Sequence, residues 1–295
     1  DLDGADVDLR QFRLWYSQAG TPRVTARIDT DAATGERMLH LAQSVPATPG
    51  QPEKAPMLIP LRLKAFDLDG GHGAEDERLV LLDRAEMAVP LGRFRSRPML
   101  SINRGFSAPV IVDFAREAGE LAWLAAHDDD PFARYEALQQ LMLDTLVAAV
   151  SGEKADHRAV VDAVATTLGG RAADPAFVAE AVLLPSEAFI GDQMVIVDPD
   201  AIRRERLALQ AAIGTALESE WRGILDEGAP PAAILSRKAK GGRRLRGVAL
   251  AYLAATRIAD IPALAFGIFS DADGMTERQA ALATLAHGDS DERVA

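Results

Sequence analysis

Residues 10–25 read R-Q-F-R-L-W-Y-S-Q-A-G-T-P-R-V-T, and within this stretch the hydrophobic pattern changes from that of a helix to that of a strand. Large apolar side chains recur at mixed three- and four-residue spacing before the change, which predicts a helix packed against a large partner that the chain lacks. These side chains are Leu9, Phe12, Leu14, Trp15 and Tyr16. Gly20 and Pro22 are typical of positions just past a helix C-terminus. Residues 23–28 then alternate with period two, as a strand does.

The chain begins at Asp1 rather than Met, and about twenty residues precede the change of pattern, too few for a domain. We therefore expect it to be a piece of a longer protein. Its 48% hydrophobic and 26% charged residues are a globular composition, and its 295 residues are enough for about two domains.

The net charge of −12 is distributed unevenly along the chain. Residues 23–115 carry 12 basic and 12 acidic residues, whereas residues 116–295 carry 18 and 28. A negative field of this kind disfavours nucleic acid and anionic membranes as partners. The chain has no Cys, which excludes disulfides and thiolate metal sites, and no apolar run of the roughly 18 residues that span a membrane. We expect a cytoplasmic location.

Residues 23–115 show the pattern of short antiparallel strands. Candidate strands cover residues 24–28, 37–43, 56–66, 78–87, 99–103 and 109–114. Residues 31–35 and 67–73 resemble hairpin loops, and residues 47–52 form a proline-punctuated link. Six or seven strands in so short a segment predict an immunoglobulin-like β-sandwich.

Residues 116–295 change to helical periodicity. Three Asp-Pro steps each supply an N-cap acceptor and a preset φ, so they predict helix starts after Asp130, Asp174 and Asp198. The apolar face of the last of these helices continues to Trp221 and Leu225. Further helices are predicted at residues 120–127, 156–168, 186–193, 240–256 and 276–287, the last opened by a capping box of Thr276 and Gln279. Antiparallel helix pairs with short links predict an armadillo- or HEAT-like stack, although no consensus repeats at a fixed period.

No metal-binding or catalytic motif is visible. The five His residues are scattered, without the paired spacing of a zinc helix: His40, His72, His127, His157 and His287. His127 precedes three aspartates that could hold a cation, but a helix end and the next N-cap explain residues 127–130 better. Residues 67–70 and 271–274 begin like calcium loops and then lack the required ligands, so we interpret them as turns.

Three further features have structural explanations. Ser107 lies in Gly-Phe-Ser-Ala-Pro, which is not the nucleophile elbow of hydrolases. The basic run at residues 236–246 is the one candidate nucleic-acid patch, but a loop and first helical turn whose charges meet neighbouring carboxylates explain it better. Trp15, Trp123 and Trp221 fall on apolar helical faces and are predicted to be core anchors. We therefore predict that this chain contains no catalytic, cofactor-binding or metal-ligating residue.

Several collinear stretches resemble the bacterial aminopeptidase N family of zinc peptidases. W-Y-S-Q-A-G-T-P at residues 15–22 resembles the exit from the catalytic domain of that family. Residues 46–60 and 105–110 resemble its sandwich domain. Residues 128–141, 184–187, 198–202 and 242–253 resemble its C-terminal helical domain.

The resemblance implies domains at residues 1–22 (the last helix of a missing catalytic domain, with a linker), 23–115 (the immunoglobulin-like sandwich) and 116–295 (a helical domain incomplete at its C-terminus). In that family an upstream domain binds zinc through an HExxH helix and a later Glu, and a GxMEN strand binds the substrate amine. This chain has neither motif. We therefore expect no cofactor in the chain and zinc in the full-length parent.

The first hypothesis is that this chain is the non-catalytic part of such an aminopeptidase, with the sandwich as spacer and the helices as a lid that restricts access. Its partners would be the missing catalytic domain and peptide substrates, without nucleic acid or membrane, and the chain alone would be inactive. The alternative is a free-standing protein-interaction module that binds a partner along its helical surface.

Overall fold

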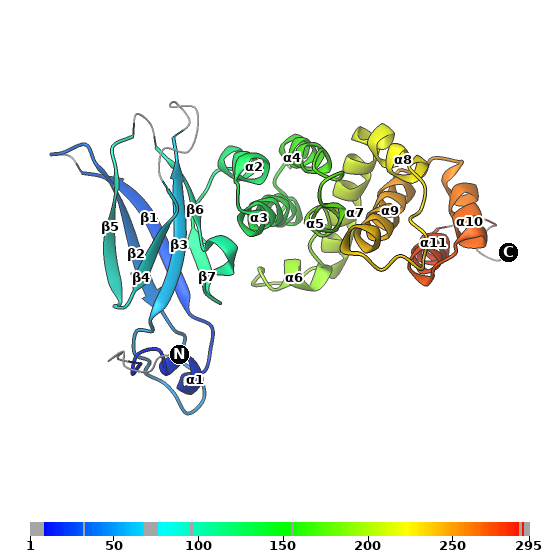
Figure 1. Ribbon diagram of the computed structural model, residues 1–295. Coiled ribbons are helices and arrows are strands. Elements are labelled where there is room, and N and C mark those ends of the chain that lie inside the picture. The colour runs from blue at the N-terminus through cyan, green and yellow to red at the C-terminus, as the bar shows by residue number, and fades with distance from the viewer. Residues whose placement is uncertain are drawn as a thin grey trace. The chain divides into compact units, whose positions relative to one another are not determined.

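The computed structural model describes residues 9–31, 33–67, 76–94, 97–154, 156–288 and 291, which fall in two compact units (Figure 1). The sandwich unit comprises residues up to 120 together with residues 128–133. The helical unit comprises residues 121–127 and those from 134 onward. The turn at residues 128–133 therefore belongs to the sandwich unit, although it follows the first residues of the helical unit in sequence.

Among the described residues, the sandwich unit contains seven strands in two sheets. They are β1 (Arg23–Thr30), β2 (Arg37–Ser44), β3 (Ile59–Phe66), β4 (Arg78–Leu82), β5 (Glu86–Gly92), β6 (Met99–Ile102) and β7 (Ile111–Phe114). One sheet has the order β5-β2-β1-β7 and the other β4-β3-β6. Both the immunoglobulin-like sandwich and the helical stack expected from the sequence are confirmed (Figure 1).

The period-two alternation of the sequence places one face of each long strand in the core. Val24 and Ala26 of β1 are buried, as are Leu39 and Leu41 of β2, while their neighbours along each strand are less buried. Gln43 is the polar exception: its amide nitrogen donates to the carbonyls of Met57, Leu82 and Arg84, and its oxygen accepts from Met57 N. A buried amide with this many partners joins β2 to the opposite sheet without an unsatisfied polar group.

Two strand predictions were wrong. The single strand expected at residues 78–87 is interrupted by a turn after Leu82, and its two parts, β4 and β5, belong to different sheets. The strands are also not all antiparallel, because β7 pairs with β1 in parallel, with Val24 opposite Val112. Alternation alone predicts which face of a strand is buried but not which strand it pairs with.

The first helix, α1 (Leu14–Ser17), is shorter than the sequence pattern predicts. Its Leu14 and Trp15 pack against the sandwich core, and Trp15 Nε1 donates to Leu58 O over 2.9 Å. The apolar partner of these two side chains is thus in this chain, contrary to our expectation. Phe12 and Tyr16 remain 42% and 82% exposed.

Ten helices follow among the described residues. They are α2 (Ala118–His127), α3 (Pro131–Val150), α4 (Arg158–Leu168), α5 (Pro175–Ala181), α6 (Glu187–Gly191), α7 (Pro199–Ala216), α8 (Glu218–Asp226), α9 (Arg237–Ala255), α10 (Ile261–Asp271) and α11 (Met275–His287). The three Asp-Pro starts are confirmed. Carboxylate oxygens of Asp130, Asp174 and Asp198 each accept a backbone N–H three residues on, at 2.8, 3.0 and 3.0 Å.

Two details of the helix prediction were wrong. The helix expected to continue from Asp198 to Leu225 ends at Ala216, and α8 begins at Glu218 with buried Trp221. The apolar spacing continues across this break because both helices face the same core. The capping box of Thr276 and Gln279 is absent, because α11 begins one residue earlier and its N-cap is Gly274, without a side-chain cap.

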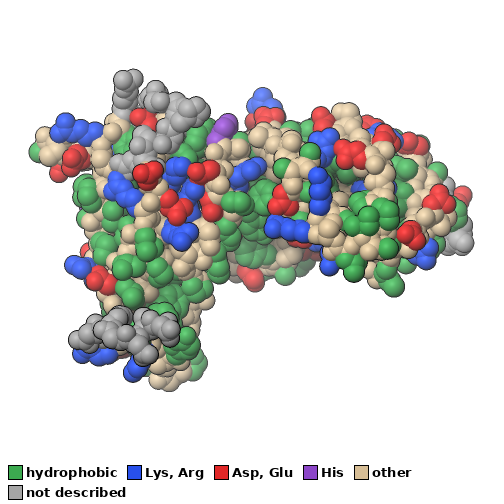
Figure 2. Space-filling view, viewed as in Figure 1, with side chains coloured by type: hydrophobic (Ala, Val, Ile, Leu, Met, Phe, Trp, Pro, Cys, Tyr) green, Lys and Arg blue, Asp and Glu red, His purple; other side chains and the backbone are tan. Residues whose placement is uncertain are grey.

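Acidic and basic side chains are interspersed with apolar ones on the face seen in Figure 2. Within the described part of the chain, no helix combines the length and the apolar character needed to cross a membrane. The expected cytoplasmic location stays a prediction.

Candidate functional site

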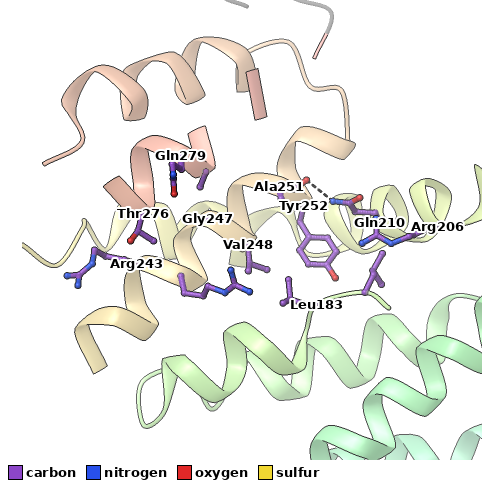
Figure 3. Close-up of a pocket in the computed structure, with 13 residues that line it drawn as sticks. Leu183, Arg206, Gln210, Arg243, Gly247, Val248, Ala251, Tyr252, Thr276 and Gln279 are labelled. Carbon is purple, nitrogen blue, oxygen red and sulfur yellow. Dashed lines mark hydrogen bonds between the residues drawn. The ribbon is translucent and has the colours of Figure 1, made fainter. Parts of the chain in front are cut away.

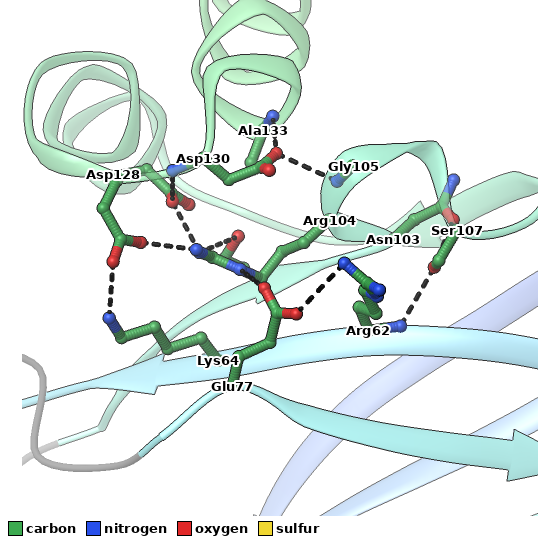
Figure 4. Close-up of polar contacts among 12 residues, drawn as sticks. Arg62, Lys64, Glu77, Asn103, Arg104, Gly105, Ser107, Asp128, Asp130 and Ala133 are labelled. Atoms are coloured by element: carbon green, nitrogen blue, oxygen red, sulfur yellow. Dashed lines mark hydrogen bonds and ion pairs between the residues drawn. The ribbon is translucent and has the colours of Figure 1, made fainter.

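A cluster of charged side chains surrounds Arg104 in the sandwich unit (Figure 4). Arg104 opens the short 3-10 helix η1 (Arg104–Phe106), which follows Asn103 in a left-handed conformation with φ 61°. Asn103 tolerates this conformation because its side chain bonds locally: Oδ1 accepts from Ala108 N and Nδ2 donates to Ala108 O. The tight turn directs the Arg104 side chain into the interior, where it is 4% exposed.

Three carboxylates surround the guanidinium of Arg104. Nη1 lies 2.5 Å from Oδ1 of fully buried Asp128, Nε lies 2.9 Å from Oε2 of Glu77, and Nη2 pairs with Asp129. Lys64 Nζ lies 2.8 Å from the other oxygen of Asp129, and Arg62 lies 3.5 Å from Glu77. Among the described residues, the cluster thus balances three cations against three anions, so the buried charges of Arg104 and Asp128 are compensated.

The environment shifts the pKa values of this cluster in different directions. Burial lowers the pKa of Arg104, but the hydrogen bonds to Glu77 and Asp129 raise it by more, so Arg104 stays charged. Burial raises the pKa of Asp128, against the opposing effect of its hydrogen bonds. The hydrogen bond from Lys64, with those from Arg104, lowers the pKa of Asp129 to about 2.

Asp130, the last of the three consecutive aspartates at residues 128–130, joins two backbone segments. Its Oδ1 accepts from Gly105 N at 3.0 Å as well as from the first turn of α3. The interpretation of residues 127–130 as a helix end and an N-cap is confirmed, because α2 ends at His127 and Asp130 caps α3. The role of Arg104 was not predicted from the sequence, since nothing local connects it to aspartates 24 and 25 residues later.

The other candidate loops have structural partners. Ser107 Oγ accepts from Arg62 N and donates to Asn103 Oδ1, so the hydroxyl is used within the turn. Asp273 accepts from Ala232 N at 3.2 Å. The calcium-like residues 68–70 lie outside the described residues, as does His72. Among the described residues, no group of three or more His, Cys, Asp or Glu side chains is placed to hold a metal ion.

The basic run is more helical than predicted: α9 begins at Arg237 rather than near residue 240, so residues 237–246 form its first turns and Ser236 is its N-cap. Ser236 caps the helix by accepting from Ala239 N. Arg237 pairs with Asp174 at 2.8 Å and Arg244 with Glu180 at 3.2 Å. Arg246 pairs with buried Glu277 at 2.7 Å. Among the described residues, carboxylates of the helical unit thus match three of the six cations of this run, which supports a packing role for Arg237, Arg244 and Arg246.

The tryptophans differ in their surroundings. Trp221 is fully buried and stacks on Tyr252, with ring centroids 4.6 Å apart. Trp15 is half-buried against the sandwich, and half-buried Trp123 stacks on His127 at 5.0 Å. The prediction of a core anchor is thus confirmed fully for Trp221.

An open groove of about 440 Å³ lies among α7, α9, α11 and the segment at Leu183 and Leu184 of the helical unit (Figure 3). Its lining includes apolar Leu183 and Val248 and polar Arg206, Gln210 and Gln279. No single sequence motif predicts this groove, because its walls come from segments more than 90 residues apart in the chain.

Comparison with protein families gives two matches. The family described as "Domain of unknown function (DUF3458_C) ARM repeats" matches residues 118–295. The chain belongs to this family. A second family, described as "Domain of unknown function (DUF3458) Ig-like fold", matches residues 20–115.

This DUF3458 chain is similar to proteins named aminopeptidase N. It is 31% identical to the one from Escherichia coli strain K12 over 95% of this chain and 33% of that protein. The Caulobacter vibrioides protein is 36% identical over 92% of this chain and 32% of that protein. The Haemophilus influenzae protein is 28% identical over 94% of this chain and 33% of that protein. The chain therefore spans about a third of the length of these relatives, and it corresponds to the C-terminal region of bacterial aminopeptidase N homologues.

A solved structure shows the same fold. Legionella pneumophila aminopeptidase A, crystallised with aspartic acid, superposes with a TM-score of 0.82 over 97% of this chain and 34% of that protein, at 22% identity. The prediction that this chain carries no catalytic, cofactor-binding or metal-ligating residue of its own stays a prediction, as do the domain boundaries after residues 22 and 115.

Proposed function

We propose that this chain is the non-catalytic part of a longer zinc-dependent aminopeptidase that removes N-terminal residues from peptides. The observation that carries the proposal is the match of 95% of the chain to about a third of E. coli aminopeptidase N. The zinc and the catalytic groups would belong to the part that this chain does not span, since the sequence has neither HExxH nor GxMEN.

The surface of the sandwich unit near α1 supports a preceding partner domain. Gln18 Nε2 donates to Ala55 O at 3.0 Å, and Gln18 Oε1 accepts from Ala55 N at 2.7 Å. With the hydrogen bond from Trp15 to Leu58 O, these contacts hold residues 15–18 firmly on the sandwich. Phe12 and Tyr16 meet edge to face with centroids 6.0 Å apart and remain exposed. These two exposed aromatic side chains, one in the turn before α1 and one on α1, form a surface that a catalytic domain would cover.

In this proposal the sandwich unit acts as a spacer and the helical unit as a lid. The lid would admit short peptides and exclude folded proteins, so selection would be by size rather than by chemistry. A free-standing interaction module is the weaker alternative, because the resemblance extends through both units in the same order as in the relatives.

A chimera tests this function. This chain would replace the matching third of E. coli aminopeptidase N, and kcat/KM would be measured for an alanyl tetrapeptide and for a folded protein with N-terminal Ala. We expect zinc-dependent cleavage of the tetrapeptide and none of the folded protein. A second chimera that lacks residues 134–295 should, if it stays folded, also cleave the N-terminal Ala of the folded protein. A soluble, zinc-loaded first chimera without peptidase activity, or two chimeras with equal discrimination, would contradict the spacer and lid roles.

A further inference from the structure

The groove of the helical unit continues into a second hollow of about 710 Å³. The two share Arg243, Arg244 and Thr276. Leu183, Val248 and Ala251 give the first hollow an apolar floor (Figure 3). Two adjoining open hollows with shared lining residues suit an extended chain of several residues better than a compact small molecule.

The lining of these hollows is cationic, although the protein carries a net charge of −12. Among the described residues, no acidic side chain lines the first hollow, and Glu180 alone lines the second. Glu180 is paired with Arg244. Arg243 is buried, and its guanidinium donates to the carbonyls of Pro230, Pro231 and Ile234. These two arginines therefore have partners within the fold.

Arg206 and Lys240 differ from these arginines, because neither forms an ion pair with any residue that the structure describes. Arg206 is half-buried, and its Nε donates to Pro185 O over 2.8 Å. That bond fixes the guanidinium and leaves both Nη groups without a partner among the described residues. Its charge also acts on buried Tyr252, whose pKa burial raises and Arg206 lowers.

A half-buried guanidinium without a carboxylate attracts an anion more strongly than an exposed one, because less solvent screens the interaction. The neighbouring side chains suit a peptide backbone. Gln210 Nε2 donates to Ala251 O at 3.1 Å, which leaves its Oε1 to accept a backbone N–H. Gln279 and Thr276 line the opposite wall on α11 (Figure 3).

We propose that this groove binds a carboxylate-bearing segment of polypeptide. The carboxylate would pair with the Nη groups of Arg206, and apolar side chains of the segment would lie on Leu183 and Val248. Lys240 would meet a second acidic group in the adjoining hollow. The carboxylate has two sources with the same chemistry, the C-terminus of a peptide or an acidic side chain. This inference does not depend on the proposed peptidase function, because it concerns the helical unit of this chain alone.

Fluorescence anisotropy with the complete chain tests the proposal. Three N-terminally labelled peptides with alternating Ala and Leu would be compared: one with a free C-terminus, one amidated, and one amidated with an internal Glu. We expect one or both carboxylate peptides to bind and the plain amide not to bind. Binding of the free acid would assign the terminal carboxylate, and binding of the Glu peptide the side chain.

Variants connect the binding to the groove. Arg206→Gln should weaken binding about tenfold or more, the usual effect of losing a charge-assisted hydrogen bond, and Lys240→Gln should weaken binding of a peptide with two acidic groups. Arg203→Gln, on the exposed face of the same helix, is the matched control and should bind as the original chain does. Thermal melting would show whether each variant is folded, and Arg206→Met, which also removes the charge, would replace Arg206→Gln if that variant does not fold.

Three results would overturn the proposal. The first is equal binding of the plain amide and the carboxylate peptides. The second is peptide binding that both Arg206 variants leave unchanged. The third is competition by inorganic phosphate or acetate that matches the peptides in affinity, since it would indicate a site for simple anions without a role for the apolar floor.

Discussion

Gly214 of α7 lies against the carbonyl of Tyr252 of α9 so closely that a Cβ atom on residue 214 would overlap the carbonyl oxygen and stand 2.9 Å from Cγ2 of Thr256. Gly241, in the same helix α9, lies in the same way against the backbone of Ala176 in α5, where a Cβ would stand 2.7 Å from Cα. Two glycines thus bring α9 into backbone contact with α7 and α5. Helix α9 is the central packing element of the helical unit.

Gly214→Ala and Gly241→Ala should each destabilise the helical unit by about 1–3 kcal/mol, because the added methyl group meets backbone atoms that cannot move aside independently. Urea unfolding followed by the fluorescence of buried Trp221 would measure the loss. Gly223→Ala in α8 is the matched control, since nothing lies within 4 Å of its added Cβ. It should be neutral or stabilising by up to about 1 kcal/mol. Equal effects at all three positions would contradict the close-packed crossings.

Arg104→Met should destabilise the sandwich unit by about 3–5 kcal/mol, since it leaves fully buried Asp128 without a counter-charge. The double variant Arg104→Met with Asp128→Leu should recover most of this loss, because it removes both buried charges. Arg84→Gln is the control on an exposed arginine that pairs with adjacent Asp83, and it should leave the unfolding free energy unchanged within error. A double variant no more stable than the single one would count against the charge-pair explanation.

The sandwich unit should need residues 128–133 for stability. A fragment of residues 1–117 retains Arg104 but loses Asp128 and Asp129, whereas a fragment of residues 1–134 keeps all three. We expect the shorter fragment to be less stable by about 3 kcal/mol or more in urea unfolding followed by circular dichroism. Equal stability would show that the sandwich folds independently of this turn.

Acid should weaken the cluster through Asp129. Its pKa is about 2 in the folded protein against 3.8 ordinarily, so its contribution is present above about pH 4 and is lost as the pH falls towards 2. Asp128, whose pKa burial raises, acts in the opposite direction. The difference in unfolding free energy between the fragment of residues 1–134 and its Asp129→Asn variant isolates the first effect. Because Asp129 is largely exposed, this difference should be below about 1 kcal/mol at pH 6 and vanish near pH 2. A difference that grows on acidification would contradict this sign.

Local chemistry in the sequence predicted much of the fold. The Asp-Pro steps predicted helix starts because the cap and the fixed φ act within one turn. Alternation predicted the buried faces of β1 and β2. The break between β4 and β5 was missed because Asp83 and Arg84, which interrupt the apolar residues, could equally lie within a half-exposed strand, and nothing local shows that the chain changes sheet.

The sites were less predictable than the fold. Arg104 and Asp128 are 24 residues apart in sequence, and their pairing depends on a left-handed turn at Asn103 that gives no hydrophobic signal. Arg206 appears in the sequence as one of several charged residues of α7. Only the structure shows that Pro185 O holds its side chain beside a groove whose described lining contains no acidic residue.

We propose that this chain is part of a longer zinc aminopeptidase and does not itself perform the chemistry. The most direct measurement is the zinc content and the alanyl-chromogenic turnover of the purified chain, with E. coli aminopeptidase N assayed alongside. Peptide hydrolysis of this type needs a metal, a base and an amine pocket in one site. We predict no stoichiometric zinc and no turnover in the chain alone. One tightly bound zinc ion, with turnover that a chelator abolishes, would contradict the account.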